Sequence, residues 1–326
     1  MKRTLTAILI LIALWPVVAQ TCETGILDAR VAESLKTFLS DLPAAPTVSV
    51  EAIKERKITP PAFPATDVKK LRVSSDSVSI QIYNPGHQTG LPIIISFHPG
   101  GFITPMLSFM EYECWRQAKV YNALVIAVDY RIAPEHPFPA AVNDAFNAFK
   151  WASEHGHEYG GDTSRIIVLG LSAGGNLAAV VCQKAKDAGL VGKIKLQILN
   201  CPSTDNPRNA DQYPSYQRYA SGYFLTKKFC QYYMQLYAPD VDIRNPDVAP
   251  IQREDLHGLP PAVIITAEFD PLRDEGFAYS NRLQKAGVTV HYRCFPGQIH
   301  NLLGLLPEAD ELQQADNIVI GAMKKI

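Results

Sequence analysis

The sequence lacks an excess of positive charge. Its 326 residues include 31 lysines and arginines against 32 aspartates and glutamates, which gives a formal net charge of −1. It also has no tract of clustered basic residues, the usual electrostatic footprint of a nucleic-acid-binding protein. We therefore expect no nucleic acid partner.

A hydrophobic run long enough to span a bilayer is also missing. The N-terminal apolar run covers residues 5–18, and as a helix it would reach about 21 Å, short of the ~30 Å hydrocarbon layer. Lys2 and Arg3 precede this run, and Val-Val-Ala at 17–19 ends it with the compact residues that signal peptidase recognises. We expect residues 1–19 to be a signal peptide, an exported protein (periplasmic or secreted), and no stable membrane span after cleavage. An uncleaved anchor is the alternative.

Cysteine spacing and metal-ligand spacing argue against two further classes. Six widely spaced cysteines resemble no small disulfide-stapled scaffold, and each suits a buried apolar position as well as a disulfide. The sequence therefore leaves their pairing open. His155 and His157 have the spacing of two metal ligands, but no third ligand is evident. We expect neither a metal nor another cofactor.

The stretch that organises the chain lies at residues 165–182. A short β-branched run is followed there by Gly170-Leu171-Ser172-Ala173-Gly174 and then by a helical apolar pattern over 176–186. Gly-x-Ser-x-Gly between a strand and a helix is typical of a nucleophile elbow, a strained turn that exposes the serine oxygen. A glycine-rich turn with an incidental serine is the alternative. We predict that Ser172 is a nucleophile, which requires a base and donors for an oxyanion.

Expected strands and helices alternate through most of the chain. The alternation predicts an α/β fold with a doubly wound, mostly parallel sheet, in which ligands bind beyond the carboxyl ends of the strands. The strands are expected at 71–83, 91–97, 123–128, 165–169, 195–199, 263–266 and 288–293, and the helices at 26–39, 108–122, 140–155 and 176–186, with one ending at 286 and one starting at 308.

Two regions depart from this alternation. Residues 20–66 contain a helix and then a proline-rich segment, which predicts an extended N-terminal wrapper. Residues 202–250 carry many aromatic side chains, which predicts a helical insertion that caps the active edge of the sheet. We therefore expect one α/β domain at 67–326 that contains the cap insertion.

Two further side chains fit a proton relay with Ser172. Asp270 follows the expected strand 263–266 by three to four residues, and His300 lies in the loop after the next strand, so both belong at the serine's sheet edge. The order serine, aspartate, histidine is the one that α/β-hydrolases use. Asp274 is the rival acid, although its place at the start of a helix suits a charge partner for the helix N-terminus. Weaker candidates for the base are His136, His257 and His291.

A glycine pair follows another buried strand. Gly100 and Gly101 come directly after His98 and Pro99, where the run 91–97 ends. Backbone N–H groups at the carboxyl end of a strand suit the stabilisation of an oxyanion. A flexible loop is the alternative.

Several motifs together resemble the bacterial hormone-sensitive-lipase-like esterase family of α/β-hydrolases. The likeness runs from about Pro92 to Leu303 and includes the elbow and the His98 glycine loop. The resemblance implies an α/β-hydrolase fold, with oxyanion donors at the backbone N–H groups of Gly100, Gly101 and Ala173. The other motifs that carry it are Tyr130-Arg131-Ile132-Ala133-Pro134-Glu135 and Asp270-Pro271-Leu272-Arg273-Asp274-Glu275-Gly276.

Three positions depart from the family pattern. Pro99 replaces the first glycine of the usual His-Gly-Gly-Gly, which removes one N–H group but leaves both expected donor glycines. Leu171 stands where the family usually has aspartate, so we expect an altered local polarity with the chemistry retained. Asn301 replaces a glycine after the histidine, and asparagine tolerates left-handed backbone better than most residues.

These features predict a serine carboxylic-ester hydrolase that works through an acyl-enzyme on small to medium acyl esters. The expected partner is a small-molecule ester, and no oligomeric state is indicated. Hydrolysis of an amide, a lactone or an acetylated carbohydrate stays open, as does an inactive hydrolase fold used for binding.

Overall fold

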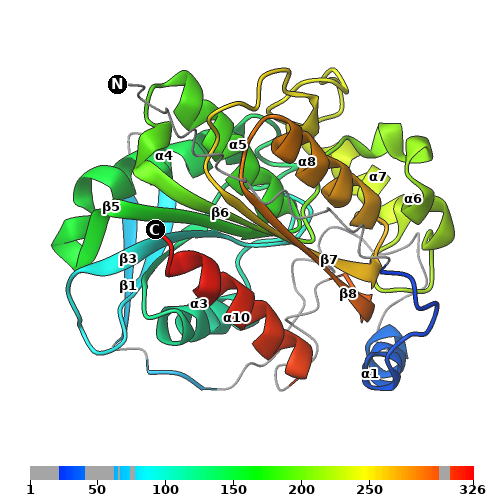
Figure 1. Cartoon of the computed structure of the whole chain (residues 1–326), viewed down its shortest axis with the longest axis horizontal. Coiled ribbons are helices and arrows are strands. Elements are labelled where there is room, and N and C mark those ends of the chain that lie inside the picture. The colour runs from blue at the N-terminus through cyan, green and yellow to red at the C-terminus, as the bar shows by residue number, and fades with distance from the viewer. Residues whose placement is uncertain (1–21, 41–61, 65–66, 74–77, 301–308) are drawn as a thin grey trace, which may run out of the picture.

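A single eight-stranded sheet forms the centre of the protein (Figure 1). The structure is a computed structural model that describes residues 22–40, 62–64, 67–73, 78–300 and 309–326. The strand order is β1-β2-β4-β3-β5-β6-β7-β8, with β1, β2 and β4 paired antiparallel and the remaining neighbours parallel. The predicted doubly wound, mostly parallel α/β sheet is confirmed.

The described strands and helices have the following bounds. The strands are β1 Val68–Val73, β2 Val78–Tyr83, β3 Leu91–Phe97, β4 Leu124–Asp129, β5 Gly161–Leu171, β6 Ile194–Asn200, β7 Ala262–Phe269 and β8 Val290–Ile299. The α-helices are α1 Ala29–Ser40, α3 Ser108–Val120, α4 Ala140–His155, α5 Ala173–Asp187, α6 Pro214–Arg218, α7 Lys227–Tyr237, α8 Arg273–Lys285 and α10 Asp310–Met323. Short 3₁₀ turns lie at Gly156–Tyr159, Val191–Lys193, Pro207–Gln212 and Pro250–Gln252.

The apolar run of β3 shows why the sheet is covered on both faces. Ile93, Ile95 and Phe97 belong to one core cluster, whereas Ile94 belongs to the other, because successive side chains of a strand point to opposite faces. Helices α4, α5 and α8 contribute side chains to the first cluster, and α3 and α10 contribute to the second. A strand buried on both faces reads as a continuous apolar run, as predicted for 91–97.

Two predicted strands differ most from the structure. The run 71–83 is not one strand but the antiparallel pair β1 and β2, separated at 74–77 by Ser-Ser-Asp-Ser, residue types that favour turns. The strand expected at 288–293 continues as β8 to Ile299, through a Pro-Gly pair that indicated a loop. It continues because β8 is an edge strand, where a proline costs no ladder hydrogen bond on its exposed side.

The region predicted as a cap folds as short helices. Helices α6 and α7 and the 3₁₀ turns Pro207–Gln212 and Pro250–Gln252 lie within 202–250 or at its end. Thr226 caps α7, since its side-chain oxygen accepts a hydrogen bond from the Phe229 N–H at 3.1 Å. Of the predicted N-terminal wrapper, α1 is described, and residues 41–61 lie outside the described part of the chain. The predicted signal peptide also lies outside it.

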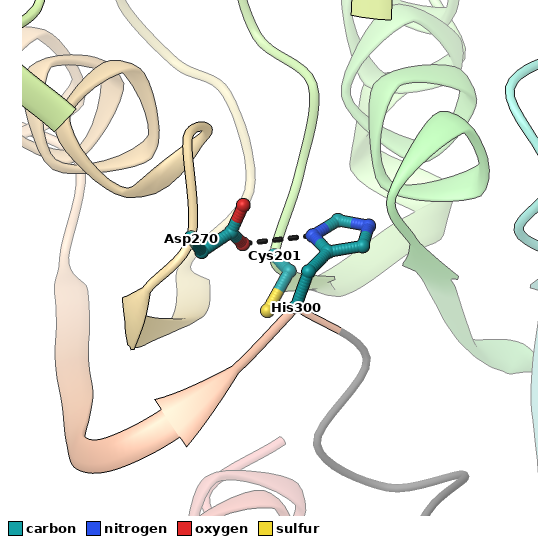
Figure 2. A group of neighbouring side chains, drawn as sticks. All are labelled: Cys201, Asp270 and His300. Atoms are coloured by element: carbon teal, nitrogen blue, oxygen red, sulfur yellow. Dashed lines mark hydrogen bonds and ion pairs between the residues drawn. The ribbon is translucent and has the colours of Figure 1, made fainter. Parts of the chain in front are cut away.

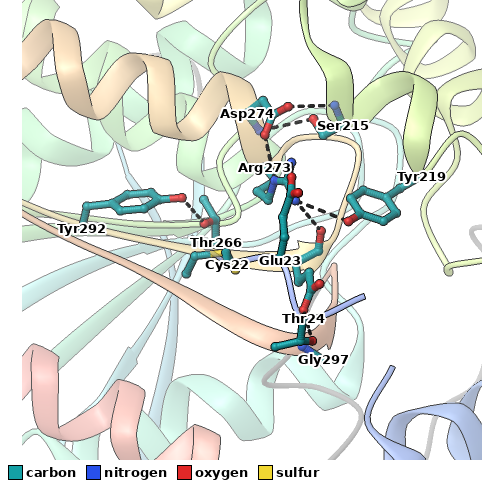
Figure 3. Close-up of a disulfide and its surroundings, with 12 residues drawn as sticks. Cys22, Glu23, Thr24, Ser215, Tyr219, Thr266, Arg273, Asp274, Tyr292 and Gly297 are labelled. Carbon is teal, nitrogen blue, oxygen red and sulfur yellow. Dashed lines mark hydrogen bonds and ion pairs between the residues drawn. A yellow bond between two sulfur atoms is a disulfide. The ribbon is translucent and has the colours of Figure 1, made fainter. Parts of the chain in front are cut away.

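A disulfide joins the N-terminal segment to the edge of the sheet (Figure 3). Cys22 and Cys294 of β8 have a Cα–Cα distance of 5.7 Å, within the usual range for a disulfide. Beside it, the carboxylate of Glu23 forms an ion pair with Arg273 at 3.1 Å. The four other cysteines, Cys114, Cys182, Cys201 and Cys230, are buried and lie outside disulfides. Both possibilities that the sequence left open for its cysteines are therefore realised.

Among the described residues, the helices are too short or too polar for any of them to cross a lipid bilayer. This finding covers only that part of the chain.

We predict that replacing both Cys22 and Cys294 with serine lowers the free energy of unfolding by about 2–5 kcal/mol, because the disulfide restricts the unfolded chain. Its loop spans 272 residues. Urea unfolding of the oxidised wild type and the double variant measures the difference. Reductant should destabilise the wild type and leave the variant unchanged, and equal unfolding midpoints for the two oxidised proteins would contradict the prediction.

Candidate active site

The turn between β5 and α5 holds Ser172 in a strained backbone conformation. Ser172 has φ 58° and ψ −118°, a region that non-glycine residues seldom adopt, and it directly precedes α5. Its N–H donates to the Asn200 carbonyl oxygen at 2.9 Å, which ties the turn to the end of β6. This conformation fits the elbow that the sequence pattern predicts.

Two glycines make this tight turn possible. A Cβ added at Gly170 would lie 2.0 Å from the Gly174 carbonyl oxygen, and one added at Gly174 would lie 2.0 Å from the Phe97 carbonyl oxygen. The atoms in these overlaps belong to the backbone, which cannot move far enough to make room for a Cβ. The end of β3, the elbow and the start of α5 therefore approach each other this closely only because residues 170 and 174 have no side chain.

We predict that Gly174→Ala prevents folding or lowers the free energy of unfolding by more than about 4 kcal/mol, because the methyl group would overlap the backbone at Phe97. Soluble yield and thermal unfolding measure the effect. Gly192→Ala is the matched control, since Gly192 is exposed and its added Cβ would meet no atom within 4 Å. A Gly174→Ala protein as stable as this control would contradict the prediction.

The imidazole of His300 lies between the other two predicted relay residues. Its Nε2 lies 2.9 Å from Ser172 Oγ, and its Nδ1 lies 2.8 Å from Asp270 Oδ2. All three side chains are buried, with relative exposures of 9% for Ser172, 0% for Asp270 and 4% for His300. The structure thus brings together the three residues that the sequence placed in one relay.

Asp270 and His300 lie closer to the ends of their strands than the sequence indicated. Asp270 is the first residue after β7, not three to four residues beyond it, and His300 is the first residue after β8, not part of a long loop. The Asp270 carboxylate also accepts a hydrogen bond from the Leu272 N–H at 2.9 Å, which fixes its orientation. Attachment directly to hydrogen-bonded strands restricts both side chains more than a loop would.

Glu268 links the two strands that Asp270 and His300 follow. Its fully buried carboxylate accepts hydrogen bonds from the N–H groups of Gly297 at 2.8 Å and Gly25 at 2.7 Å, and from the Thr24 hydroxyl at 2.8 Å. Glu268 precedes Asp270 by two residues, and Gly297 precedes His300 by three. Through these hydrogen bonds, the N-terminal segment helps to fix the end of β8 and thereby the position of the His300 imidazole.

The predicted oxyanion donors are backbone N–H groups in the glycine loop and at the start of α5. Gly100 and Gly101 have φ of 124° and 61°, left-handed values that glycine adopts without strain. Ala173 is the first residue of α5, so its N–H has no partner within the helix. Gly101, Ser172 and Ala173 line one cavity. This arrangement suits the binding of negative charge beside the serine oxygen.

His98 supports the glycine loop. Its ring stacks on Tyr130 with the centroids 4.1 Å apart, and its Nδ1 donates to the Pro99 carbonyl oxygen at 2.8 Å. The Tyr130 hydroxyl donates to the His98 carbonyl oxygen at 2.8 Å. Burial lowers the pKa of His98, so the ring is held neutral in this position. The sequence motif beginning at Tyr130 thus bears directly on the loop's placement.

The departures from the family pattern have different surroundings. Pro99 supplies the carbonyl that His98 binds, so its missing N–H leaves this contact intact. Leu171 is half-buried at the last position of β5. Asn301 lies outside the described residues.

The cavity beside Ser172 measures about 40 Å³. Tyr233 lines it and packs closely on the glycine loop, since a Cβ on Gly101 would lie 2.3 Å from the Tyr233 ring. The remaining lining is mostly apolar and comes from the residue after the glycine loop, from the cap region and from the residue before α8: Phe102, Ser203, Pro207, Leu225, Cys230, Met234 and Leu272.

The rival acid has another role. Asp274 lies in the first turn of α8, accepts a hydrogen bond from the Ser215 N–H at 2.8 Å and pairs with Arg273 at 2.7 Å. It therefore ties the cap region to α8, in addition to its favourable place at the helix N-terminus.

Sequence reasoning did not single out Cys201, Glu268 or Tyr233. Cys201 directly follows β6 and lies beside Asp270 and His300 (Figure 2). Its position after the expected strand 195–199 is the signal that could have placed it at the active edge. Glu268 and Tyr233 carried no comparable signal, because their contacts join segments far apart in the sequence.

Comparisons with known proteins agree with this architecture. The family model described as alpha/beta hydrolase fold matches residues 94–304. The chain is 35% identical to the esterase LipI of Mycobacterium tuberculosis over 299 residues, which cover 90% of this chain and 88% of LipI. It is 36% identical to an arylesterase of Saccharolobus solfataricus over 259 residues, covering 78% and 81% of the two chains.

Among solved structures, the ester-hydrolase EH1AB1 from the metagenome of Lake Arreo superposes with a TM-score of 0.80 at 32% identity. The match covers 91% of this chain and 98% of that one. The sequence identity, the matched length and the shared fold agree with the resemblance read from the motifs. The chain therefore belongs to the hormone-sensitive-lipase-like esterase family of α/β-hydrolases.

Proposed function

We propose that the protein hydrolyses carboxylic esters through a Ser172-His300-Asp270 triad and an acyl-enzyme. The observation that carries the proposal is the position of His300, whose two ring nitrogens lie within hydrogen-bond distance of Ser172 Oγ and Asp270 Oδ2. A serine hydroxyl becomes an effective nucleophile when a neighbouring base removes its proton.

In the first half of the reaction, Ser172 Oγ attacks the ester carbonyl carbon while His300 Nε2 takes the hydroxyl proton. Asp270 accepts a hydrogen bond from Nδ1–H, which keeps Nε2 as the acceptor and stabilises the imidazolium that forms. The N–H groups of Gly100, Gly101 and Ala173 bind the oxyanion of the tetrahedral intermediate. The imidazolium then protonates the departing alkoxide, and the acyl group stays on Ser172.

In the second half, a water molecule takes the place of the serine hydroxyl as the nucleophile and attacks the acyl-enzyme. His300 removes a proton from water, the hydroxide attacks the acyl carbon, and a second tetrahedral intermediate forms at the same donors. Its collapse returns the proton from His300 to Ser172 Oγ and releases the carboxylic acid. The enzyme is restored with no net change in its protonation.

The cavity size supports a short acyl group. One water molecule needs a cavity volume of about 10–15 Å³. The cavity of about 40 Å³ therefore accommodates an acyl chain of few carbons. The apolar side chains of Leu225, Met234 and Leu272 at the cavity favour a hydrocarbon chain over a polar one. We therefore favour short acyl esters over acetylated carbohydrates, lactones or amides as substrates.

We also propose that the protein is exported. The charged and apolar pattern of residues 1–19 supports this proposal. The Cys22–Cys294 disulfide supports it independently, because disulfides persist mainly in oxidising compartments.

Ser172→Ala should lower kcat on a short-chain aryl ester by at least about 10³-fold, since it removes the nucleophile. Release of the aryl alcohol measures the rate. A fluorophosphonate probe should label the wild type, and neither the boiled wild type nor the variant should react. Asp274→Asn is the matched control, and it should keep probe labelling. Wild-type turnover by Ser172→Ala would contradict the triad, and an unlabelled, inactive wild type would favour a binding protein.

Leu225→Ala should move the preferred acyl chain to greater length, because it removes apolar volume from the cavity wall. The measurement is kcat/KM for a series of aryl esters that share one alcohol and differ only in the acyl chain. Val120→Ala, an exposed change on α3, is the control and should keep the wild-type order. An unchanged order in Leu225→Ala would place the acyl group elsewhere.

A further inference from the structure

Three side chains that can bind metals converge at the ends of three neighbouring strands. Cys201 directly follows β6, Asp270 follows β7 and His300 follows β8. The Cys201 sulfur, a carboxylate oxygen of Asp270 and a ring nitrogen of His300 all lie within 4.8 Å of one another (Figure 2). Each residue is at most 4% exposed. Within the described residues, this is the one such group of three.

We propose that Cys201, Asp270 and His300 form a binding site for a soft or borderline divalent cation, such as Zn²⁺ or Cd²⁺, and that binding there reversibly switches the enzyme off. The binding site stands on the structure alone, whereas the inhibition rests on the proposed function of His300.

The spacing of the ligand atoms supports the site. Typical bond lengths to zinc are about 2.3 Å for sulfur and about 2.0–2.2 Å for nitrogen and oxygen, so tetrahedral ligands lie roughly 3.4–3.6 Å apart. The present His300–Asp270 separation of 2.8 Å is shorter, and the 4.8 Å limit of the group is longer. Side-chain rotations that move these atoms by about 1 Å are therefore sufficient.

The charges of the site also fit a divalent cation. A thiolate, a carboxylate and a neutral imidazole together carry two negative charges, so a bound divalent ion leaves the buried cluster neutral. Burial of an unpaired charge is costly, whereas a charge that is paired or coordinated is tolerated. Sulfur and imidazole ligands select zinc and cadmium over magnesium and calcium, which prefer oxygen ligands.

The backbone at Cys201 is fixed, which holds its thiol beside Asp270 and His300. Cys201 has φ 41°, and its N–H donates to the Ile265 carbonyl oxygen at 2.7 Å, so the backbone is tied to β7. Cys182 and Cys230 are also buried thiols, but neither forms a comparable group with an imidazole and a carboxylate among the described residues. Cys230 lines the cavity beside Ser172 and is therefore the appropriate control.

Binding of the cation would prevent His300 from acting as a base, because it changes which ring nitrogen carries the proton. The cation bonds to Sγ, to a carboxylate oxygen and to Nδ1, and a water molecule can fill a fourth position. The thiol proton leaves to solvent, and the imidazole proton moves from Nδ1 to Nε2. Protonated Nε2 no longer has the lone pair that accepts the Ser172 proton, and Asp270 no longer accepts a hydrogen bond from Nδ1–H.

Cadmium binding tests the site directly. Untagged wild type, Cys201→Ser and Cys230→Ser are compared by equilibrium dialysis and by the ultraviolet absorption of the cadmium–thiolate bond. We expect one high-affinity ion per wild-type chain with a thiolate band, the same for Cys230→Ser, and at least about tenfold weaker binding without the band for Cys201→Ser. Thermal unfolding without metal establishes that each variant is folded. Equal affinity and an equal band in Cys201→Ser would overturn the site.

The inhibition is tested separately, as the ratio of rates with and without Zn²⁺ for each protein. We expect wild type and Cys230→Ser to lose at least about 90% of their rate at saturation through a fall in kcat, and a chelator to restore it. Cys201→Ser should require at least about tenfold more Zn²⁺, and Mg²⁺ should not inhibit. Undiminished activity with cadmium bound at Cys201 would overturn the inhibition alone, whereas an inactive wild type that binds cadmium would instead count against the proposed function.

Discussion

The active site depends on one constraint: the carboxyl ends of neighbouring parallel strands lie at one edge of the sheet. Strands β5, β7 and β8 end at Leu171, Phe269 and Ile299, and the next residue of each is the proposed nucleophile, acid and base, respectively. The hydrogen bonds of the sheet fix the positions of these strand ends independently of the side chains that follow them. The three side chains are therefore already close enough to make contacts of 2.8 and 2.9 Å. The geometry of the candidate site therefore follows from the same burial of apolar strands that stabilises the fold.

How far the sequence predicted this site depends on how local each determinant is. The elbow at Ser172 was predictable because its glycines and its flanking strand and helix are contiguous in the chain. Asp270 and His300 were predictable from their place after apolar runs, although the strand ends were set too early. The Cys22–Cys294 pair, by contrast, joins residues 272 apart, and no local pattern distinguishes a paired cysteine from a buried one.

The strand ends were misplaced for a physical reason. Local turn residues such as Pro296 and Gly297 normally end a strand, but tertiary hydrogen bonds overrule that preference here. The Gly297 N–H donates to the Glu268 carboxylate of β7, and the Gly297 carbonyl oxygen accepts from the Asp28 N–H at 2.9 Å, so a side chain of β7 and the N-terminal segment supply partners beyond the β7 ladder. Sequence patterns report local preference, whereas Glu268 belongs to the neighbouring strand β7 and Asp28 to the opposite end of the chain.

Backbone strain is concentrated at the same sheet edge, and it is offset there by hydrogen bonds. Ser172, Cys201 and Phe102 all have positive φ, at 58°, 41° and 65°. Such conformations cost free energy in non-glycine residues and persist only where the surroundings fix them. Each has a backbone partner: the N–H groups of Ser172 and Cys201 donate to neighbouring strands, and the Phe102 carbonyl accepts from Ala133 at 2.9 Å. Since those partners belong to the buried sheet or its connections, the strained residues cannot relax without breaking the core, and the core thereby maintains the geometry of the site.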